Sequence, residues 1–283
     1  MRHSSFACFI LSHGRPDNQL TYAALRKCGY TGKIYILIDD EDITAEKYRK
    51  KYGEYVVQFS KDEIAKDVDR ADLSTDKRSI LWSRNAVFKA ASDLGFEHFL
   101  ELDDDYKVFA YRHVLGNKLK VFNIKNLDVV FDEYLDFLDA SGALAVCMGQ
   151  GGDYIGGVGS NAVKNGILRK AMNVLFLRSD RPFKFRGFYN DDVNTYTTLS
   201  HQGKLFFTIP QIMVEHNETQ SLGGGMTETY KENGTYVKAF YSVMMCPSAV
   251  KVAMMDCKHS RIHHQVSWNH CAPKILHEKY KKV

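Results

Sequence analysis

The chain has 283 residues, of which 45% are hydrophobic and 25% are charged, an ordinary balance for a globular protein. No apolar run approaches the length of a membrane span, so a membrane-spanning protein is excluded. The formal net charge of +4 comes from 38 basic and 34 acidic residues and permits a polyanionic partner without requiring one.

Six cysteines are scattered along the chain without the spacing of a disulfide framework, which is typical of reduced thiols. The apolar stretch 6–11 is too short for the core of a signal peptide. We therefore expect a cytoplasmic protein.

The first hundred residues alternate short apolar runs with amphipathic stretches, as βαβ units do. The pattern predicts strands over 6–11, 34–38, 55–59 and 98–102, and helices over 18–27, 45–51 and 77–94. The second half is less regular, with strands expected over 144–148, 174–177 and 205–208 and a further apolar run over 209–214. Glycine-rich segments at 149–159 and 223–225 indicate backbone that is mobile or that approaches a ligand closely.

Three of the predicted strands end in polar segments, Ser12 to Pro16, Asp39 to Asp42 and Asp103 to Asp105. Ligands of α/β sheets bind beyond the carboxyl ends of the strands, so these segments are candidate site residues. Three adjacent carboxylates favour a hard divalent cation such as Mg²⁺ or Mn²⁺, with open positions for a diphosphate. Since strand side chains alternate, Asp103 and Asp105 would face one side and Asp104 the other. A solvated acidic turn is the alternative.

The segment FLELDDDY resembles the D-x-D motif of the glycosyltransferase A-type (GT-A) fold, which is Rossmann-like and binds nucleotide-diphospho-sugars. The resemblance implies one α/β domain over residues 1–283 with a mixed central sheet. In it, residues 1–106 form the nucleotide-sugar-binding half, and residues 107–283 form a decorated acceptor half. It also implies that Asp103, Asp105 and His216 hold Mn²⁺ or Mg²⁺. A UDP-sugar would contact Ser12, His13, Arg15, Asp39, Asp40, Arg84 and Asp104.

The segment Asn190-Asp191-Asp192, at the start of a predicted helix, resembles the acidic x-E-D motif of the same fold. Carried over, Asp192 is the base that deprotonates an acceptor hydroxyl, and Asp191 orients the acceptor or the donor. Helix capping is the alternative for both residues, since acidic side chains are favoured in the first turn. A structural histidine is the alternative for His216.

Cations and aromatic rings alternate in the segment 178–186, which favours contact with an acceptor or with DNA through Arg178, Arg181, Lys184 and Arg186. An edge loop is the alternative. The segment from Lys258 onward is also basic and is a candidate anion-binding surface, or else a solvated terminus. Cysteines and histidines between Cys257 and Cys271 lack the paired spacing of a zinc site, so we do not expect zinc there.

The whole chain, with its opening FxxFILSHxRP-like pattern, resembles the phage-type DNA glycosyltransferases associated with TET/JBP pyrimidine hydroxylases. The resemblance implies transfer of a sugar from a UDP-sugar to the hydroxymethyl group of a modified pyrimidine in DNA, commonly 5-hydroxymethylcytosine. Three alternatives stay open: a GT-A enzyme that acts on a glycan, protein or small molecule, a sugar nucleotidyltransferase, and a non-catalytic DNA-binding module. The single glycine of Ser12 to Pro16 argues against the nucleotidyltransferase, which normally has a glycine-rich phosphate loop there.

Overall fold

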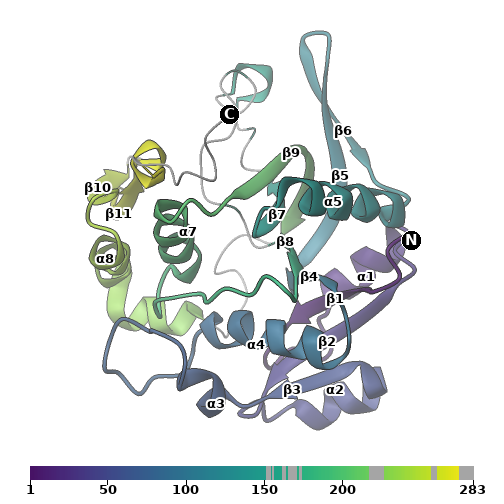
Figure 1. Cartoon of the computed structure of the whole chain (residues 1–283), viewed down its shortest axis with the longest axis horizontal. Helices are drawn as coiled ribbons and strands as arrows, with labels where there is room; N and C mark the ends of the chain where they lie inside the picture. The colour runs from purple at the N-terminus through teal and green to yellow at the C-terminus, as the bar shows by residue number, and fades with distance from the viewer. Residues whose placement is uncertain are drawn as a thin grey trace, which may run out of the picture.

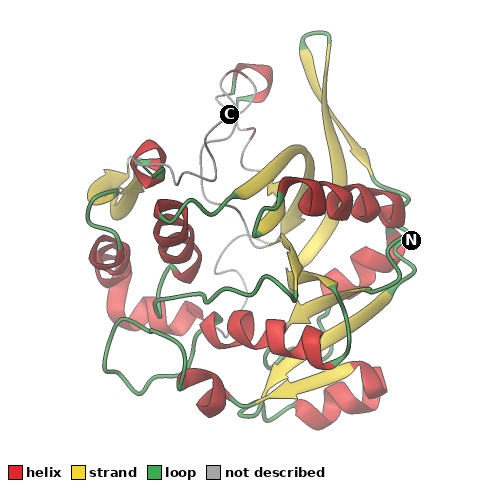
Figure 2. Ribbon diagram, viewed as in Figure 1, coloured by secondary structure: helices red, strands yellow, loops and turns green. Residues whose placement is uncertain are grey.

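The computed structural model of the protein describes residues 1–150, 154, 156–160, 164, 171, 174–216, 226–255 and 260–273. These residues form a nine-stranded mixed sheet with helices on both faces, and a separate two-stranded sheet (Figures 1 and 2). The strand order of the large sheet is β3-β2-β1-β4-β8-β7-β9-β5-β6. The expected mixed α/β class is therefore confirmed.

Parallel pairing joins the first four strands of this order, β3 (Val56–Phe59), β2 (Lys33–Asp39), β1 (Phe6–Leu11) and β4 (His98–Asp103). The strands β8 (Val174–Arg178), β7 (Ala145–Gln150), β9 (Phe206–His216), β5 (Tyr106–Leu115) and β6 (Lys118–Asn123) complete the sheet. All their pairings are antiparallel except that of β7 with β9. Strands from both predicted halves thus form one continuous sheet.

The two faces of the sheet carry different helices because side chains alternate along each strand. On one face, Cys8 and Ile10 of β1 pack with α1 (Leu20–Lys27) and α5 (Leu127–Ser141), and α2 (Ala45–Tyr52) covers Ile36 and Ile38. On the other face, Ala7 and Phe9 pack with α4 (Leu81–Asp93), and α7 (Asp191–His201) covers the neighbouring strands. Burial on both faces explains why these strands read as continuous apolar runs.

The remaining elements extend this framework. The short α3 (Lys61–Ala65) follows β3, and α8 (Met226–Met245) packs on α7 and on the hairpin of β10 (Val250–Met255) and β11 (Arg261–Val266). None of the helices in the described ranges is long and apolar enough to cross a membrane. The five described cysteines are buried.

The predicted strands and helices of the first half are confirmed, with two late helix starts. The first helix begins at Leu20 because Gln19 is non-helical and its amide donates to Ser12 Oγ at 2.7 Å. The helix predicted over 77–94 begins at Leu81, after Ser79, whose hydroxyl donates to Phe188 O at 3.0 Å. In the second half, the strand expected over 205–208 continues to His216 as a single strand.

Candidate active site

The polar segments predicted at the strand ends do meet at one edge of the sheet. Leu11, the last residue of β1, pairs in register with Leu37 of β2 and with Asp103 of β4. Parallel strands end at the same edge, so the segments that follow β1, β2 and β4 lie side by side there. The chain then turns at Asp104 and Asp105 into β5.

His216 lies at the same place although more than a hundred residues separate it from the aspartates. It ends β9 directly opposite Tyr106, the residue after Asp105, and the two rings are 6.5 Å apart. Its Nε2 is 3.3 Å from Gln150 Oε1. The β5–β9 pairing therefore brings His216 beside the acidic turn.

The three aspartates are not equivalent. Asp104 is buried and accepts hydrogen bonds from Ser12 Oγ at 2.7 Å and from Arg15 Nη1 at 3.0 Å. Burial raises the pKa of its carboxyl, against the lowering influence of Arg15 and Ser12. Asp103 and Asp105 are only half-buried. Asp104 thus ties the β1–α1 loop to the turn, whereas Asp103 and Asp105 are less buried, although Oδ1 of Asp103 is itself buried.

Carboxylate oxygens in a partly open turn suit Mg²⁺ or Mn²⁺. Tyr106 donates its hydroxyl to Asp103 Oδ2 at 3.4 Å. Within the described part of the chain, the carboxylates of Asp103 and Asp105 and the ring of His216 do not converge to within 4.8 Å of one another. A shared ion would therefore require side-chain rotations.

His13 and Asp39, predicted to contact the nucleotide-sugar, form a pair. His13 Nδ1 lies 2.6 Å from Asp39 Oδ2, and Lys61 Nζ is 2.8 Å from Asp39 Oδ1. The hydrogen bond to Asp39 raises the pKa of His13. Burial alone would raise the pKa of Asp39, but the bonds to His13 and Lys61 lower it. The half-exposed His13 ring is thus the part of this group that faces solvent, while Asp40 is exposed and accepts a hydrogen bond from Lys61 N.

The buried side chain of Arg84 lies against two carboxylates, those of Asp191 and Glu101. Its side chain is 3% exposed, its Nη1 donates to Asp191 Oδ2 at 2.7 Å, and its Nε is 3.4 Å from Glu101 Oε1. Burial alone would lower the pKa of Arg84, but the surrounding carboxylates raise it well above its ordinary value. These are Asp191, Asp103, Glu101 and Asp192. The guanidinium is therefore turned to Asp191 of α7 and Glu101 of β4, within electrostatic range of Asp103 in the acidic turn.

Glu101 shares this buried space, and its two carboxyl oxygens have no hydrogen-bond partner. Burial raises its pKa to about 8, which outweighs the opposing effect of Arg84. Burial therefore favours the protonated form of Glu101.

The predicted helix start at residues 190–192 is confirmed by α7, which begins at Asp191. Asn190 precedes it in the left-handed conformation, with φ 52°, and its amide donates to Lys238 O at 2.7 Å. Asp192 is buried and accepts a hydrogen bond from Val193 N at 2.7 Å. Both aspartates thus lie in the first helical turn, and Asp191 also holds Arg84.

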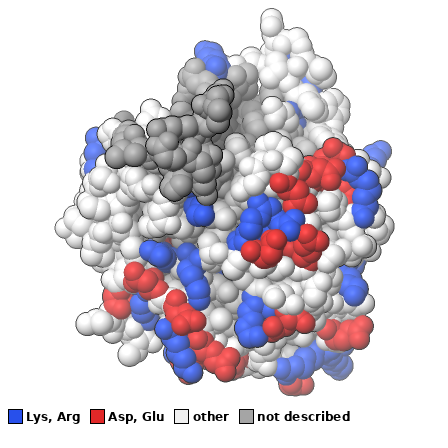
Figure 3. Space-filling model, in the orientation of Figure 1, with Lys and Arg blue, Asp and Glu red and all other residues white. Residues whose placement is uncertain are grey.

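The basic segment does not lie where we expected an acceptor site. Because β8 runs antiparallel to β4, Arg178 pairs with His98, at the edge of the sheet opposite to Asp103. Its guanidinium is bound by Asp139 at 2.5 Å and by Asp180 at 2.7 Å, and Arg181 Nη2 is 3.5 Å from Asp139. In Figure 3, basic and acidic side chains are interspersed on the face shown. The acceptor role expected of Arg178 and Arg181 is therefore not supported.

The other two residues of the segment are closer to α7. Lys184 is exposed, 3.6 Å from Asp67, and Arg186 donates its backbone N–H to Thr195 Oγ1 at 3.0 Å. The segment runs from the far edge of the sheet to the start of α7, and Phe185 anchors it in the core.

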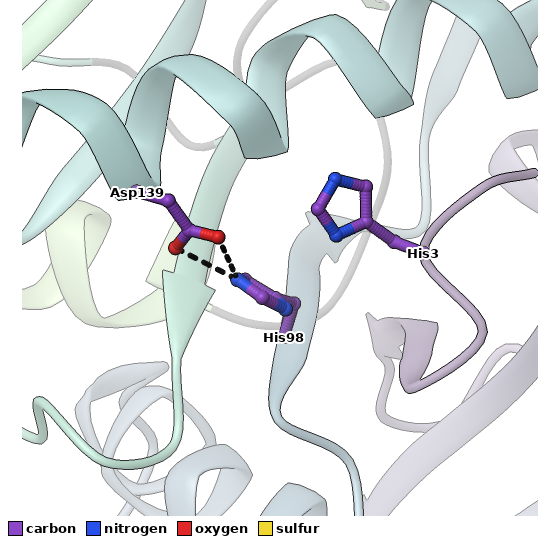
Figure 4. Close-up of side chains that lie close together, drawn as sticks. All are labelled: His3, His98 and Asp139. Carbon is purple, nitrogen blue, oxygen red and sulfur yellow. Dashed lines mark hydrogen bonds and ion pairs between the residues drawn. The ribbon is translucent and has the colours of Figure 1, made fainter.

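At that far edge, the N-terminus approaches α5. His3, His98 and Asp139 have ligand atoms within 4.8 Å of one another, and His98 Nε2 is 2.9 Å from Asp139 Oδ1 (Figure 4). Arg178 Nη1 is 3.0 Å from the same nitrogen of His98. A guanidinium in that position already meets the charge of Asp139, so the group is better described as an ion-pair network than as a metal site.

Several predictions fall outside the described residues. These are residues 151–153 and 155 of the glycine-rich segment, the segment 223–225, Lys258 and the tail from Lys274 onward. The cysteines and histidines between Cys257 and Cys271, where we do not expect zinc, are described only in part, without Cys257 and His259.

Sequence reasoning missed Glu101, Lys61 and the β5–β6 hairpin. Glu101 had a usable signal, since it is a single charged residue within a strand that is otherwise apolar over 99–102. The hairpin also had one, since Gly116-Asn117 separates two stretches rich in β-branched and aromatic residues.

Comparisons with known proteins bear on the fold and the family. Two solved structures of glucosyl-3-phosphoglycerate synthase from Mycobacterium tuberculosis are similar to the chain. The complex with Mg²⁺ and UDP has 10% identity and a TM-score of 0.47, and covers 92% of this chain and 87% of that one. The complex with Mn²⁺, UDP and phosphoglyceric acid has 9% identity and a TM-score of 0.48, and covers 92% and 86%.

A mannosyltransferase from Pyrobaculum calidifontis in complex with GDP-Man and Mn²⁺ matches at 10% identity and a TM-score of 0.45, and covers 86% of this chain and 74% of that one. TM-scores below 0.5 are too low for these similarities to assign a substrate. No curated protein matches the sequence. A family model, described as TET-Associated Glycosyltransferase, matches residues 6–225, which include β1, the acidic turn, Arg84, α7 and His216. The chain therefore belongs to the TET-associated glycosyltransferase family.

Proposed function

We propose that this protein moves a sugar from a UDP-sugar to the hydroxymethyl group of 5-hydroxymethylcytosine in DNA, and that it requires Mn²⁺ or Mg²⁺. One observation supports this most: Arg84 donates to Asp191 at the start of α7 and also feels the charge of Asp103 in the acidic turn, two segments almost ninety residues apart. A sugar transfer requires a place for the diphosphate and a carboxylate for the acceptor within one site. Family membership supports the transfer of a sugar, and the association with TET supports a modified pyrimidine as the acceptor.

On the donor side, Asp103 and Asp105 would hold the cation, with His216 as a third ligand. The bound cation would neutralise charge on the departing diphosphate. The half-exposed ring of His13, whose pKa is raised by Asp39, would donate to an anionic part of the donor. Asp39 itself is held by Lys61 and would fix the orientation of His13.

On the acceptor side, the hydroxymethyl oxygen attacks the anomeric carbon, and the bond from that carbon to the UDP oxygen breaks. UDP leaves with the electron pair, and for an inverting transfer Asp192 takes the hydroxyl proton. For a retaining transfer the same residue would position the acceptor. Asp191 keeps its contact with Arg84 in both cases, so it would orient rather than accept the proton.

The test is a screen of UDP-sugars against a hydroxymethylcytosine DNA duplex, with the DNA product weighed by mass spectrometry and UDP release followed in parallel. We expect a mass increase of one sugar with the correct donor and Mn²⁺. Release of pyrophosphate instead of UDP would indicate a nucleotidyltransferase. UDP release that is stimulated only by a glycan, protein or small molecule would overturn the DNA acceptor, and no UDP release from any UDP-sugar would favour a binding module.

A further inference from the structure

The ribbon formed by β5 and β6 has an unusual charge. Over residues 106–127 the sequence has no Asp or Glu, although the whole chain has nearly as many acidic as basic residues. The same stretch contains Lys107, Arg112, Lys118, Lys120 and Lys125. Figure 3 shows no acidic side chain on the projecting end. A segment with this composition attracts polyanions.

The ribbon projects from the body of the protein (Figure 1). In the described structure, β5 pairs with β9 only from Tyr106 to Tyr111, and from there to Leu115 it pairs with β6 alone. The two strands are joined through Gly116 and Asn117, and Gly116 has φ +59°, as a tight two-residue hairpin loop requires. At ~3.4 Å per residue, the part beyond Tyr111 reaches about 14 Å out of the sheet.

The two faces of the ribbon differ. Register pairs Tyr111 with Phe122 and His113 with Lys120, so these four side chains share one face, together with Lys118. On this face the rings of Tyr111 and His113 stack at 5.9 Å, and Phe122 lies 6.5 Å from His113 and is 49% exposed. Lysines and aromatic rings therefore form one exposed surface.

The opposite face touches the rest of the protein through Arg112, while Val114 and Val121 on that face are exposed. The guanidinium of Arg112 lies 4.6 Å from the centre of the Tyr154 ring, and Tyr154 donates to Pro210 O of β9 at 2.6 Å. This contact braces the ribbon and leaves the face with Lys118, Lys120 and Phe122 turned away from it.

The ribbon also begins at the candidate active site. Tyr106, its first residue, directly follows Asp105 and lies opposite His216. The ribbon thus leads from the candidate active site to Lys120 and Lys118, which pair with His113 and Leu115, seven and nine residues beyond Tyr106 along β5.

We propose that the β5–β6 ribbon is an arm that binds duplex DNA through the face with Lys118, Lys120 and Phe122. This inference deepens the proposed function and rests on it. The major groove of B-form DNA, about 12 Å wide, admits a two-stranded β-ribbon, whereas the deep and narrow major groove of A-form RNA does not. The lysines would contact phosphates, and Phe122 would contact base edges or an unstacked base.

The test measures binding of the full-length protein, without donor, to an unmodified DNA duplex of about 20 base pairs by fluorescence anisotropy. The salt concentration is varied between about 50 and 200 mM. The variant Lys118→Ala/Lys120→Ala removes two cations from the arm. The matched control is Lys47→Ala/Lys50→Ala, which removes two exposed cations from α2. This helix packs on β2, next to the edge strand β3, whereas β6 is the strand at the other side of the sheet.

We expect the arm variant to bind about tenfold more weakly and to reduce the slope of log K against log salt by about 2, since each phosphate contact contributes ~0.9. The control should bind as the unmodified protein does. Phe122→Ala should weaken binding and leave the salt slope unchanged, because it removes a ring and no charge.

Equal losses in the arm variant and the control, or none in either, would overturn the proposal. Equal affinity for an RNA duplex of the same sequence would overturn the fit to the DNA groove. Because binding is measured without donor, this result is independent of sugar transfer. If the protein transfers no sugar but the arm variant still loses DNA affinity, the proposed enzymatic function is refuted and the DNA-binding arm is not.

Discussion

Replacing Arg84 by methionine tests whether this residue joins the two halves of the site. The side chain is 3% exposed and Asp191 is 9% exposed, so both charges are largely removed from water. Methionine keeps much of the volume but leaves Asp191 without its cation. Removing one partner of a buried ion pair costs about 3–5 kcal/mol. We expect a loss of this size in the free energy of unfolding, measured with urea.

A double-mutant cycle separates the pair from other effects. Asp191→Asn alone leaves Arg84 near Glu101 and Asp103, so we expect a smaller loss of about 1–3 kcal/mol. In Arg84→Met/Asp191→Asn, neither charge remains, and the loss should fall short of the sum by about 1–3 kcal/mol. Arg84→Lys keeps the positive charge but lacks the planar, forked guanidinium, and it is the conservative control. A loss below about 1 kcal/mol for Arg84→Met, or strict additivity in the cycle, would refute the reasoning.

Three other substitutions test separate parts of the site. The pKa of Glu101 is raised to about 8, so folding takes up a proton and stability should fall by about 3 kcal/mol from pH 5 to pH 8. Glu101→Gln should remove that fall, and urea titrations at both pH values decide it. Asp105→Asn should abolish metal-dependent release of UDP, while the midpoint of thermal unfolding stays within a few degrees. The control is Glu54→Gln, which changes an exposed carboxylate elsewhere in the protein. Unchanged turnover of Asp105→Asn would reject the role of Asp105 as a metal ligand. Gly187 has φ +85° and its added Cβ would overlap the Asn194 amide, so Gly187→Ala should cost about 2–4 kcal/mol of unfolding free energy, and a neutral effect would contradict this.

The sequence by itself determined the local features of this protein. Periodicity predicted β1, β2, β3 and β4 and the helices α1, α2 and α4, because β1, β2 and β4 are buried on both faces and apolar and the helices are amphipathic, whereas the short α3 was missed. The position of the acidic turn was predicted as well, because the apolar run of β4 ends at Leu102, directly before the three aspartates. The start of α7 at Asp191 was also predicted, since acidic residues favour the first helical turn.

Only the tertiary structure decided which charges meet. The antiparallel direction of β8 sends Arg178 to the edge opposite Asp103, and no local pattern encodes that direction. Asp104 is buried and bonded to Ser12, which distinguishes it from Asp103 and Asp105. Arg84 is buried and turned to Asp191, because a buried charge requires a partner, and that partner can be far away in the sequence. The reach of the β5–β6 ribbon likewise follows from where β9 stops pairing. Secondary structure depends on neighbours in the sequence, whereas a site depends on neighbours in space.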